Sequence, residues 1–250
     1  MRARYALLFW AILTGPVAAQ TVAELVATSV TLEAAGRPKD ALAVLLQAEK
    51  LDPTNAGALW RAARQYDQLA VAALTEPEKK QFNAKALDAA QRAVRAGPKD
   101  SQAHLYLAIV YGRMATSESP RKKIELSKLI REEAEIAAQL DPKNDVAWFI
   151  LGRWNYEMAN FNPFLKGLAQ AIYGKFPDAS NEKAAACFEK AIAASPARPD
   201  YHIEYGRTLA ALGKKNEARK QLEKGLLLPS NSKDDEETMQ RARQALQELK

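Results

Sequence analysis

A helical pattern that ends in proline recurs along this chain and constrains its fold more than any other feature. The units end at Pro53, Pro98, Pro142, Pro196 and Pro229. Ahead of each of the first four prolines, small or apolar residues stand 12, 8 and 5 positions earlier, as Ala41, Leu45 and Ala48 do in the first unit. Residues at such spacings share one helix face, and proline cannot continue a helix. Each unit therefore ends in a helix with a narrow apolar face.

A matching helix precedes each of the later terminal helices. It carries a large residue, a small residue four positions on, and a third residue three positions further. The sets are Leu59–Ala63–Tyr66, His104–Ala108–Tyr111, Trp148–Gly152–Asn155 and His202–Gly206–Leu209. The small residue in the middle lets a second helix approach closely, so we expect the two helices of a unit to cross there. Gly36 and Gly213 are placed to end the earliest and the last of these first helices.

These helical pairs resemble the tetratricopeptide repeat (TPR), a helix–turn–helix of about 34 residues, over nearly all of residues 21–230. The prolines are 45, 44, 54 and 33 residues apart, so three units carry roughly 10, 10 and 20 extra residues between their helices. Each insert can lengthen helices or add a short one. Thr75 with Glu78, and Ser119 with Pro120, have the pattern of helix starts.

A final helix is predicted from Ser232 to about Leu249, acidic at its start and basic at its end, as suits a polar cap. Long alternating runs typical of strands are missing from the sequence. We therefore predict an all-α superhelix of about five TPR-like helical hairpins, with long inter-helix inserts and a C-terminal capping helix.

Residues 1–19 have the pattern of a signal peptide. Arg2 and Arg4 precede a nine-residue apolar run, and Val17-Ala18-Ala19 offers small side chains for cleavage. A spanning helix needs about 20 predominantly apolar residues, and Gly15-Pro16 interrupts this run too early. We expect an exported chain, periplasmic or secreted, with its repeat domain at 20–250. The alternative is a retained membrane anchor.

Charge and cysteine content narrow the classes of partner. The formal charge is +6, from 36 basic and 30 acidic residues, and loss of Arg2 and Arg4 with the leader leaves about +4. A nucleic-acid binder would concentrate its positive charge in one stripe, whereas here both signs are interspersed, so we expect no nucleic-acid partner. Cys187 is the sole cysteine and falls within a helical pattern, which indicates a buried structural thiol.

Motifs for catalysis or metal binding are missing from the sequence. His104 and His202 are the only histidines, and neither has metal-ligand spacing. Both stand at the same packing position of their repeats, which favours a structural role. The chain has no G-x-S-x-G, phosphate-loop or dinucleotide fingerprint. We expect a non-enzymatic protein with no cofactor and no metal.

One stretch resembles a particular family. Residues Leu151-Gly152-Arg153-Trp154-Asn155-Tyr156-Glu157 are followed by an insert that ends in Tyr173-Gly174-Lys175-Phe176-Pro177. This combination, within residues 148–192, resembles the regulators of microtubule dynamics, here as an exported, bacterial-type member. The resemblance implies a non-enzymatic adaptor. Animal members are associated with microtubules or with organelle contact sites and lipid, and export argues against the microtubule role here.

The insert at 162–176 has apolar residues on one side of a helix. We expect this helix to dock onto the repeats. The alternative is an exposed contact with a membrane or a partner.

A candidate site follows from the geometry of such stacks, in which the first helices line the concave surface. The residues expected there are Trp60, Arg64, Arg113, Phe149, Arg153, Tyr156 and Arg207. Arginine contacts carboxylate or phosphate in two-pronged fashion, so we predict a scaffold for a protein or peptide partner, for which an acidic segment would be suited. The rival function is binding of anionic lipid headgroups or a membrane surface through the same basic face. Alternatively, the arginines pair internally with Asp67, Glu157 and Glu204.

The leader hypothesis makes a direct prediction about processing. Mass spectrometry of the protein from its native host should give an N-terminus near Gln20, because the small residues Val17-Ala18-Ala19 form the cleavage site. A full-length chain held in the membrane fraction would contradict the export prediction.

Overall fold

The computed structural model describes residues 20–229 and 233–249, in which twelve α-helices and no strands are found. The helices are α1 (Val22–Ala34), α2 (Pro38–Leu51), α3 (Ala56–Ala72), α4 (Glu76–Ala96), α5 (Ser101–Ala115), α6 (Pro120–Leu140), α7 (Asp145–Ala159), α8 (Pro163–Tyr173), α9 (Asn181–Ala194), α10 (Pro199–Ala211), α11 (Lys215–Leu227) and α12 (Lys233–Glu248). The signal peptide predicted at 1–19 and the helix start predicted at Ser232 lie outside the described residues.

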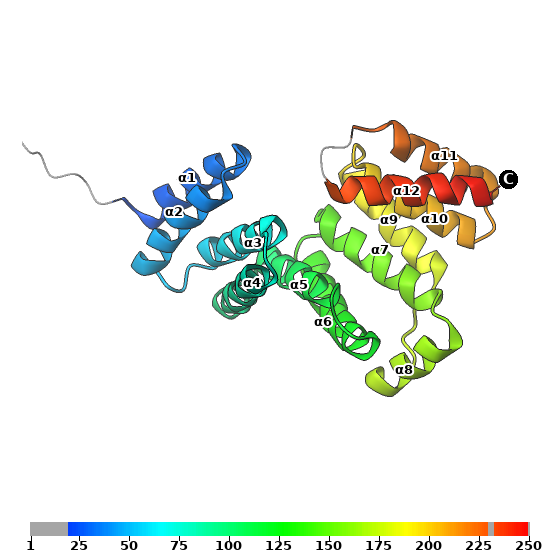
Figure 1. Cartoon of the computed structure of the whole chain (residues 1–250), viewed down its shortest axis with the longest axis horizontal. Helices are drawn as coiled ribbons and strands as arrows, with labels where there is room; N and C mark the ends of the chain where they lie inside the picture. The colour runs from blue at the N-terminus through cyan, green and yellow to red at the C-terminus, as the bar shows by residue number, and fades with distance from the viewer. Residues whose placement is uncertain (1–19, 230–232, 250) are drawn as a thin grey trace, which may run out of the picture.

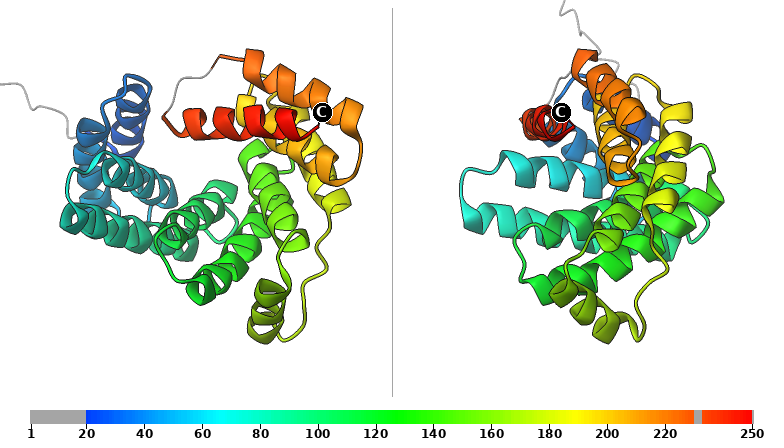
Figure 2. Two further views of the ribbon diagram at one scale, coloured as in Figure 1. Left: turned by 45° about the vertical axis from the view of Figure 1, so that its right-hand side comes forward. Right: turned by 90° about the vertical axis from the view of Figure 1, so that its right-hand side faces the viewer.

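The helices form a curved stack of five hairpins, α1–α2, α3–α4, α5–α6, α7–α9 and α10–α11 (Figure 1). Figure 2 shows that the first helix of each hairpin lies on the inner side of the curve and the second on the outer side. Helix α12 packs against both α10 and α11, so it takes the place that the first helix of a sixth hairpin would take. The predicted all-α superhelix with a capping helix is confirmed.

The inserts lengthen helices in two hairpins and add a short helix in a third, which are the two predicted outcomes. Helices α4 and α6 are each 21 residues long, so the first two inserts lengthen the second helix of their hairpins. The side chains of Thr75 and Ser119 accept hydrogen bonds from Glu78 N and Lys122 N at the starts of these helices, which confirms both starts. The third insert forms α8. Gly36 and Gly213 adopt φ of 67° and 76° where α1 and α10 end, a conformation that favours glycine.

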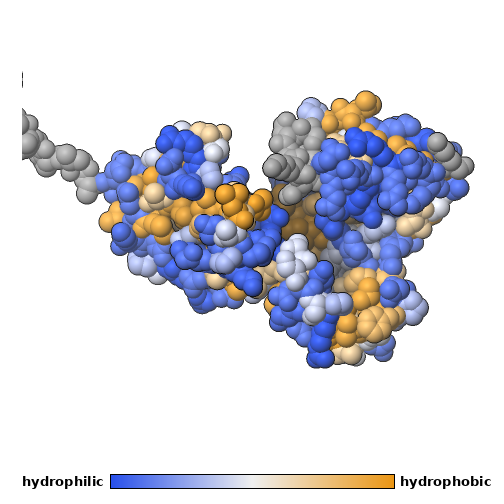
Figure 3. All heavy atoms as spheres, in the orientation of Figure 1, coloured by the Kyte–Doolittle hydropathy of each residue, from blue (hydrophilic) through white to orange (hydrophobic). Residues whose placement is uncertain are grey.

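Helix α8 docks onto α6 and α7, as the favoured interpretation expected. Leu165, Leu168 and Ile172 pack against a cluster that includes Ile124 of α6 and Trp154 of α7. Trp154 Nε1 donates to the hydroxyl of Tyr173 at 3.3 Å. Phe164 remains 73% exposed, and apolar side chains gather over this part of the molecule (Figure 3). In the described part of the chain, none of the helices combines the length and apolarity needed to cross a membrane.

The four hairpins from α3 to α11 close because the first-helix residue at the crossing is small. An added Cβ at Gly152 would lie 2.7 Å from Phe188 Cε1, and one at Gly206 would lie 2.7 Å from Leu222 Cγ. Phe188 and Leu222 are fully buried. The hairpins with alanine on the first helix have alanine on the second helix as well, since Ala63 packs in a cluster with Ala90, and Ala108 in one with Ala134. In these four hairpins, the side chains that meet at the crossing are thus matched in size.

A hydrogen bond to a proline carbonyl fixes the start of three first helices. His104 Nε2 lies 3.1 Å from Pro98 O, Trp148 Nε1 lies 2.9 Å from Pro142 O, and His202 Nε2 lies 2.9 Å from Pro196 O. A carbonyl only accepts, so both histidines donate from Nε2. Their Nδ1 atoms contact Glu133 and Gln221 of the second helices. Both histidines are buried and hold the hairpin together, in agreement with the structural role predicted for them.

Gly152→Ala tests the matched crossing. The new methyl group meets the buried ring of Phe188, so the free energy of unfolding should fall by about 1–2 kcal/mol, from an overpacking cost of about 1–3 kcal/mol partly offset by alanine's higher helix propensity. Gly167→Ala in α8 is the matched control, because no atom lies within 4 Å of its added Cβ. The control should be neutral or slightly stabilising in urea denaturation. Equal effects of the two substitutions would contradict the crossing geometry.

Candidate functional site: the concave groove

The predicted site residues come from four first helices on the inner side of the curve. Helix α3 carries Trp60 and Arg64, α5 carries Arg113, α7 carries Phe149, Arg153 and Tyr156, and α10 carries Arg207. Figure 3 shows a hollow between the part of the molecule built from α1–α4 and the part built from α7–α12. The hollow lies on the concave side, so first-helix residues border it.

Ion pairs join successive inner helices through largely shielded carboxylates. Glu33 of α1 lies 3.0 Å from Arg64 of α3 and 3.2 Å from Arg61. Asp67 of α3 lies 3.0 Å from Arg113 of α5. Because each bridge ties one hairpin to the next, these arginines have a structural task along the groove.

The last inner helices are bridged by a shared carboxylate. Glu204 of α10 is only 3% exposed and lies 2.7 Å from Arg207 and 3.5 Å from Arg241 of α12. The guanidinium of Arg207 also lies 5.0 Å from the ring centroid of Tyr156, a cation–π contact that joins α7 to α10. Burial raises the pKa of the Tyr156 hydroxyl, so this ring stays neutral at physiological pH.

Arg153 is the exception among the predicted arginines. Its one ion pair is with Glu157 on the same helix, at 3.9 Å, and the two side chains are 43% and 51% exposed. Such exposed pairs contribute about 0.3–0.5 kcal/mol. Among the described residues, the row of ion pairs between inner helices is therefore interrupted at α7, where Arg153 pairs only within its own helix.

The internal pairs proposed as an alternative are thus present in the structure, but they differ in strength. Arg113 and Arg207 hold Asp67 and Glu204 closely, whereas Arg153 holds Glu157 loosely. Sequence reasoning missed the pair of Arg64 with Glu33, whose partners are 31 positions apart.

The three predicted aromatic residues are placed differently from one another. Trp60 is buried, stacks on Tyr106 with ring centroids 5.1 Å apart, and is covered by Arg61. Phe149 packs between Phe188 and Tyr201. Tyr156 is half-buried and borders a pocket, so it is the aromatic side chain best placed to contact a ligand.

That pocket has a volume of about 420 Å³ and lies between α7, α10 and α12. Its lining includes Tyr156, Arg207, Ala210, Lys215, Arg241 and Ala245. Sequence reasoning treated α12 only as a cap and missed Arg241. The sequence did contain a signal for Arg241. The predicted capping helix stands in the place of a first helix, and a first helix turns some of its residues toward the concave side.

The other candidates for chemistry remain structural. Cys187 is half-buried against apolar residues of α5, α6 and α7. Burial raises the pKa of its thiol, which makes it a poor nucleophile. Among the described residues, no group of three or more His, Cys, Asp or Glu side chains is arranged to hold a metal ion.

The family is decided by a match along almost the whole repeat region. The family model described as "Regulator of microtubule dynamics protein 1-3" matches residues 25–250. The chain belongs to this family. Regulator of microtubule dynamics protein 3 from Xenopus laevis is 32% identical over 133 residues, which cover 53% of the chain and 29% of the frog protein. The chain spans less than half the length of the curated relatives that it matches first.

Solved structures place this family member among TPR folds. A thermophilic TPR protein from Thermus thermophilus matches with a TM-score of 0.58 at 20% identity, covering 91% of the chain and 100% of that protein. The pilF protein of Pseudomonas aeruginosa matches with a TM-score of 0.60 at 13% identity, covering 91% of each chain. At these identities the likeness shows the fold alone, and it supports the hairpin stack described above.

Because Glu204 is buried and Glu157 is exposed, removing their charges should lower the free energy of unfolding by different amounts. Glu204→Gln should lower the free energy of unfolding by about 3 kcal/mol, because it leaves Arg207 and Arg241 without their buried carboxylate. Glu157→Gln, at the exposed pair with Arg153, should cost less than about 1 kcal/mol. Urea denaturation of both variants checks this order, and similar losses in the two would show that Arg153 is held as firmly as Arg207.

Proposed function

We propose that the chain is a non-enzymatic scaffold that binds a protein segment in its concave groove. The curved TPR stack supports this proposal, since its inner face presents side chains from several hairpins to one extended ligand. The observation that carries it is the interruption of the inner ion-pair row at α7, where Arg153 keeps donors free. A bound acidic side chain or chain end would supply the carboxylate that the neighbouring helices do not.

The relatives' name connects them with microtubules, and we do not extend that role to this chain. It spans less than half of those relatives, and a chain exported through its leader would not meet microtubules. The partner that we propose is an acidic protein segment in the compartment to which the chain is delivered.

Arg153 variants test the proposal. Arg153→Ala should weaken binding of the partner about tenfold or more, because a well-aligned charge-assisted hydrogen bond contributes about 1.5–3 kcal/mol and about 1.4 kcal/mol is a factor of ten. Arg153→Lys should restore only part of the affinity, since an ammonium lacks the two-pronged geometry. Binding should also weaken as salt concentration rises.

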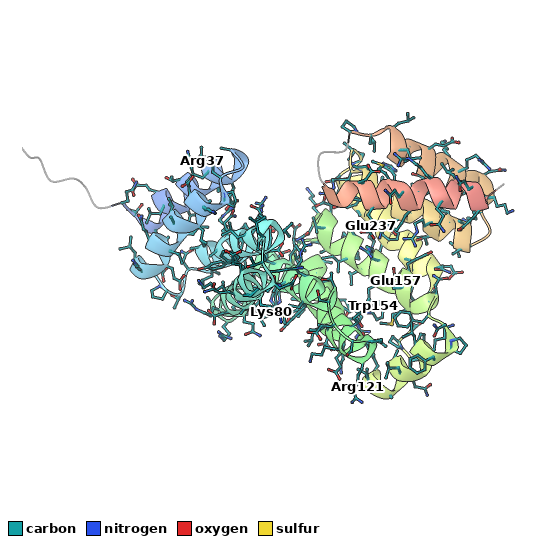
Figure 4. All side chains as sticks on the ribbon, viewed as in Figure 1. Arg37, Lys80, Arg121, Trp154, Glu157 and Glu237 are labelled. Atoms are coloured by element: carbon teal, nitrogen blue, oxygen red, sulfur yellow. The ribbon has the colours of Figure 1, made fainter. Side chains whose placement is uncertain are left out.

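Arg121→Ala is the matched control. Arg121 is also an exposed arginine paired with a glutamate four residues along its helix, but it lies at the start of α6 near α8, away from the hollow (Figure 4). Proteins from an extract of the native host would be captured on the parent chain and on each variant. The proposal expects a partner retained by Arg121→Ala and depleted by Arg153→Ala at equal thermal stability. Identical capture by the parent and by the Arg64, Arg153 and Arg207 variants would contradict it.

The rival function, binding of anionic lipid headgroups, is separated by cosedimentation with anionic vesicles. A groove specific for protein predicts that Arg153→Ala leaves sedimentation unchanged. Arg153-dependent sedimentation in the absence of any Arg153-dependent protein partner would favour the lipid function instead.

A further inference from the structure

A second pocket lies between α6, α7 and α9, and the concave groove does not account for it. Its volume of about 370 Å³ falls within the usual range of about 300–1,000 Å³ for ligand pockets. Helices α6 and α9 are the second helices of their hairpins and lie on the outer side of the curve (Figure 2). This outer pocket is therefore separate from the inner face that carries Arg153.

Asn155 makes room for the outer pocket. The same position of three other first helices carries a large side chain, Tyr66, Tyr111 or Leu209, and each of these packs in an apolar cluster. Asn155 is shorter, lines the pocket and is only 8% exposed. Its Nδ2 donates to Leu151 O at 2.9 Å, and none of the described residues donates to its Oδ1. This oxygen is thus left for a ligand, since an acceptor shielded from water without a partner costs free energy.

Arg131 of α6 supplies a donor to the same pocket. It stands 11 positions before Pro142, where the first two units have Leu42 and Leu87, so a charged side chain replaces an apolar one. Glu135 Oε1 lies 3.6 Å from the Nε of Arg131, which is too far for a hydrogen bond. The Nε is buried and lacks an acceptor in the described part of the chain, so a ligand carbonyl would satisfy it.

The insert helix α8 holds the guanidinium group of Arg131 in place. This group lies 5.1 Å from the ring centroid of Trp154 and 5.9 Å from that of Tyr173. The Tyr173 hydroxyl is itself fixed, because it accepts from Trp154 Nε1 and lies 3.0 Å from Ser127 Oγ. A side chain held in this way loses little conformational freedom when a ligand binds, so the insert pre-organises the donor.

The charged groups that line the outer pocket cancel one another. Two cations, Arg131 and Lys183, stand beside two carboxylates, Glu135 and Asp178. Lys183 Nζ lies 2.5 Å from the Asp178 carboxylate, and Arg131 is paired with Glu135. Because no charge is left over among these lining residues, an ionic ligand would lose its hydration there without gaining a partner. The outer pocket therefore favours an uncharged ligand.

A peptide main chain matches the polar groups of the outer pocket. It offers carbonyl acceptors for Arg131 and N–H donors for Asn155, while the walls formed by Trp148, Leu151 and Trp154 suit an apolar side chain. We propose that the outer pocket binds an uncharged, apolar peptide segment of a partner protein through these contacts. This site adds a second binding face to the scaffold, distinct in position and in ligand charge from the concave groove.

The experiment uses three blocked peptides that differ in one side chain. Acetyl-Ala-Leu-Ala-carboxamide would be titrated into the isotope-labelled whole chain and should shift the NMR signals of the Asn155 side-chain amide and the Trp148 indole. Acetyl-Ala-Asp-Ala-carboxamide and acetyl-Ala-Lys-Ala-carboxamide should each bind about tenfold more weakly, because burial of an unpaired charge is costly. Equal binding of the three peptides would contradict the inference.

Asn155→Leu separates a binding role from a structural one. It introduces the residue type that Leu209 supplies at the same position of α10, so it should fill the pocket and weaken binding of the leucine peptide by about tenfold or more. The urea midpoint of unfolding should rise, because a shielded amide oxygen without a donor is removed. A lower midpoint would show that Asn155 is kept for the fold and would overturn the inference.

Two further variants keep the test decisive. Arg131→Leu should also weaken the leucine peptide about tenfold, whereas Arg121→Leu, on the same helix but outside the pocket lining, should leave binding unchanged. Ala186→Leu fills the pocket from an exposed position of α9 and should block binding without touching the polar groups.

Absence of binding by the leucine peptide, or binding that survives both Arg131→Leu and Ala186→Leu, would overturn the inference. Capture of a partner that depends on Arg153 involves the opposite face and would persist in either case. Failure of this inference is therefore distinguishable from failure of the proposed function.

Discussion

The close approach of two helices at each hairpin crossing is the constraint on which the rest of the structure depends. The second helix presents Phe188 or Leu222 where the first helix has glycine, and alanine where the first helix has alanine. The two helices of these hairpins thus stay close together although the side chains between them differ. Because these hairpins keep a close spacing between their two helices, they can stack side by side in a curve, and the first helices line its concave face (Figure 1).

The concave face is held together by charges as well as by packing. The carboxylates of Glu33, Asp67 and Glu204 each bind an arginine of the next inner helix. Pairs of this kind fix geometry more than they add stability, since removal of both charges from water is costly. The row of ion pairs is interrupted at α7, and Arg153 is the most exposed of the four predicted inner arginines.

Much of the fold was predictable from sequence because its determinants are local and periodic. The prolines, the crossing residues and Gly36 or Gly213 set helix ends and register, and these were placed correctly. Side-chain pairing on the inner face was harder to predict. Arg64 binds Glu33 from a different hairpin, and Trp60 is buried by Tyr106, a neighbour that the repeat pattern does not specify. The place of Arg241 depends on how α12 docks, which periodicity alone does not give.

A double-mutant cycle between Gly152 and Phe188 tests the central claim most directly. It would compare the free energies of unfolding of the parent, Gly152→Ala, Phe188→Leu and the double variant. If the glycine is required because the ring of Phe188 occupies the space of its Cβ, alanine should cost much less beside the smaller leucine. The expected coupling is about 1 kcal/mol or more, in the range for residues in contact. Additivity within about 0.5 kcal/mol would contradict the size-matched crossing and the curvature derived from it.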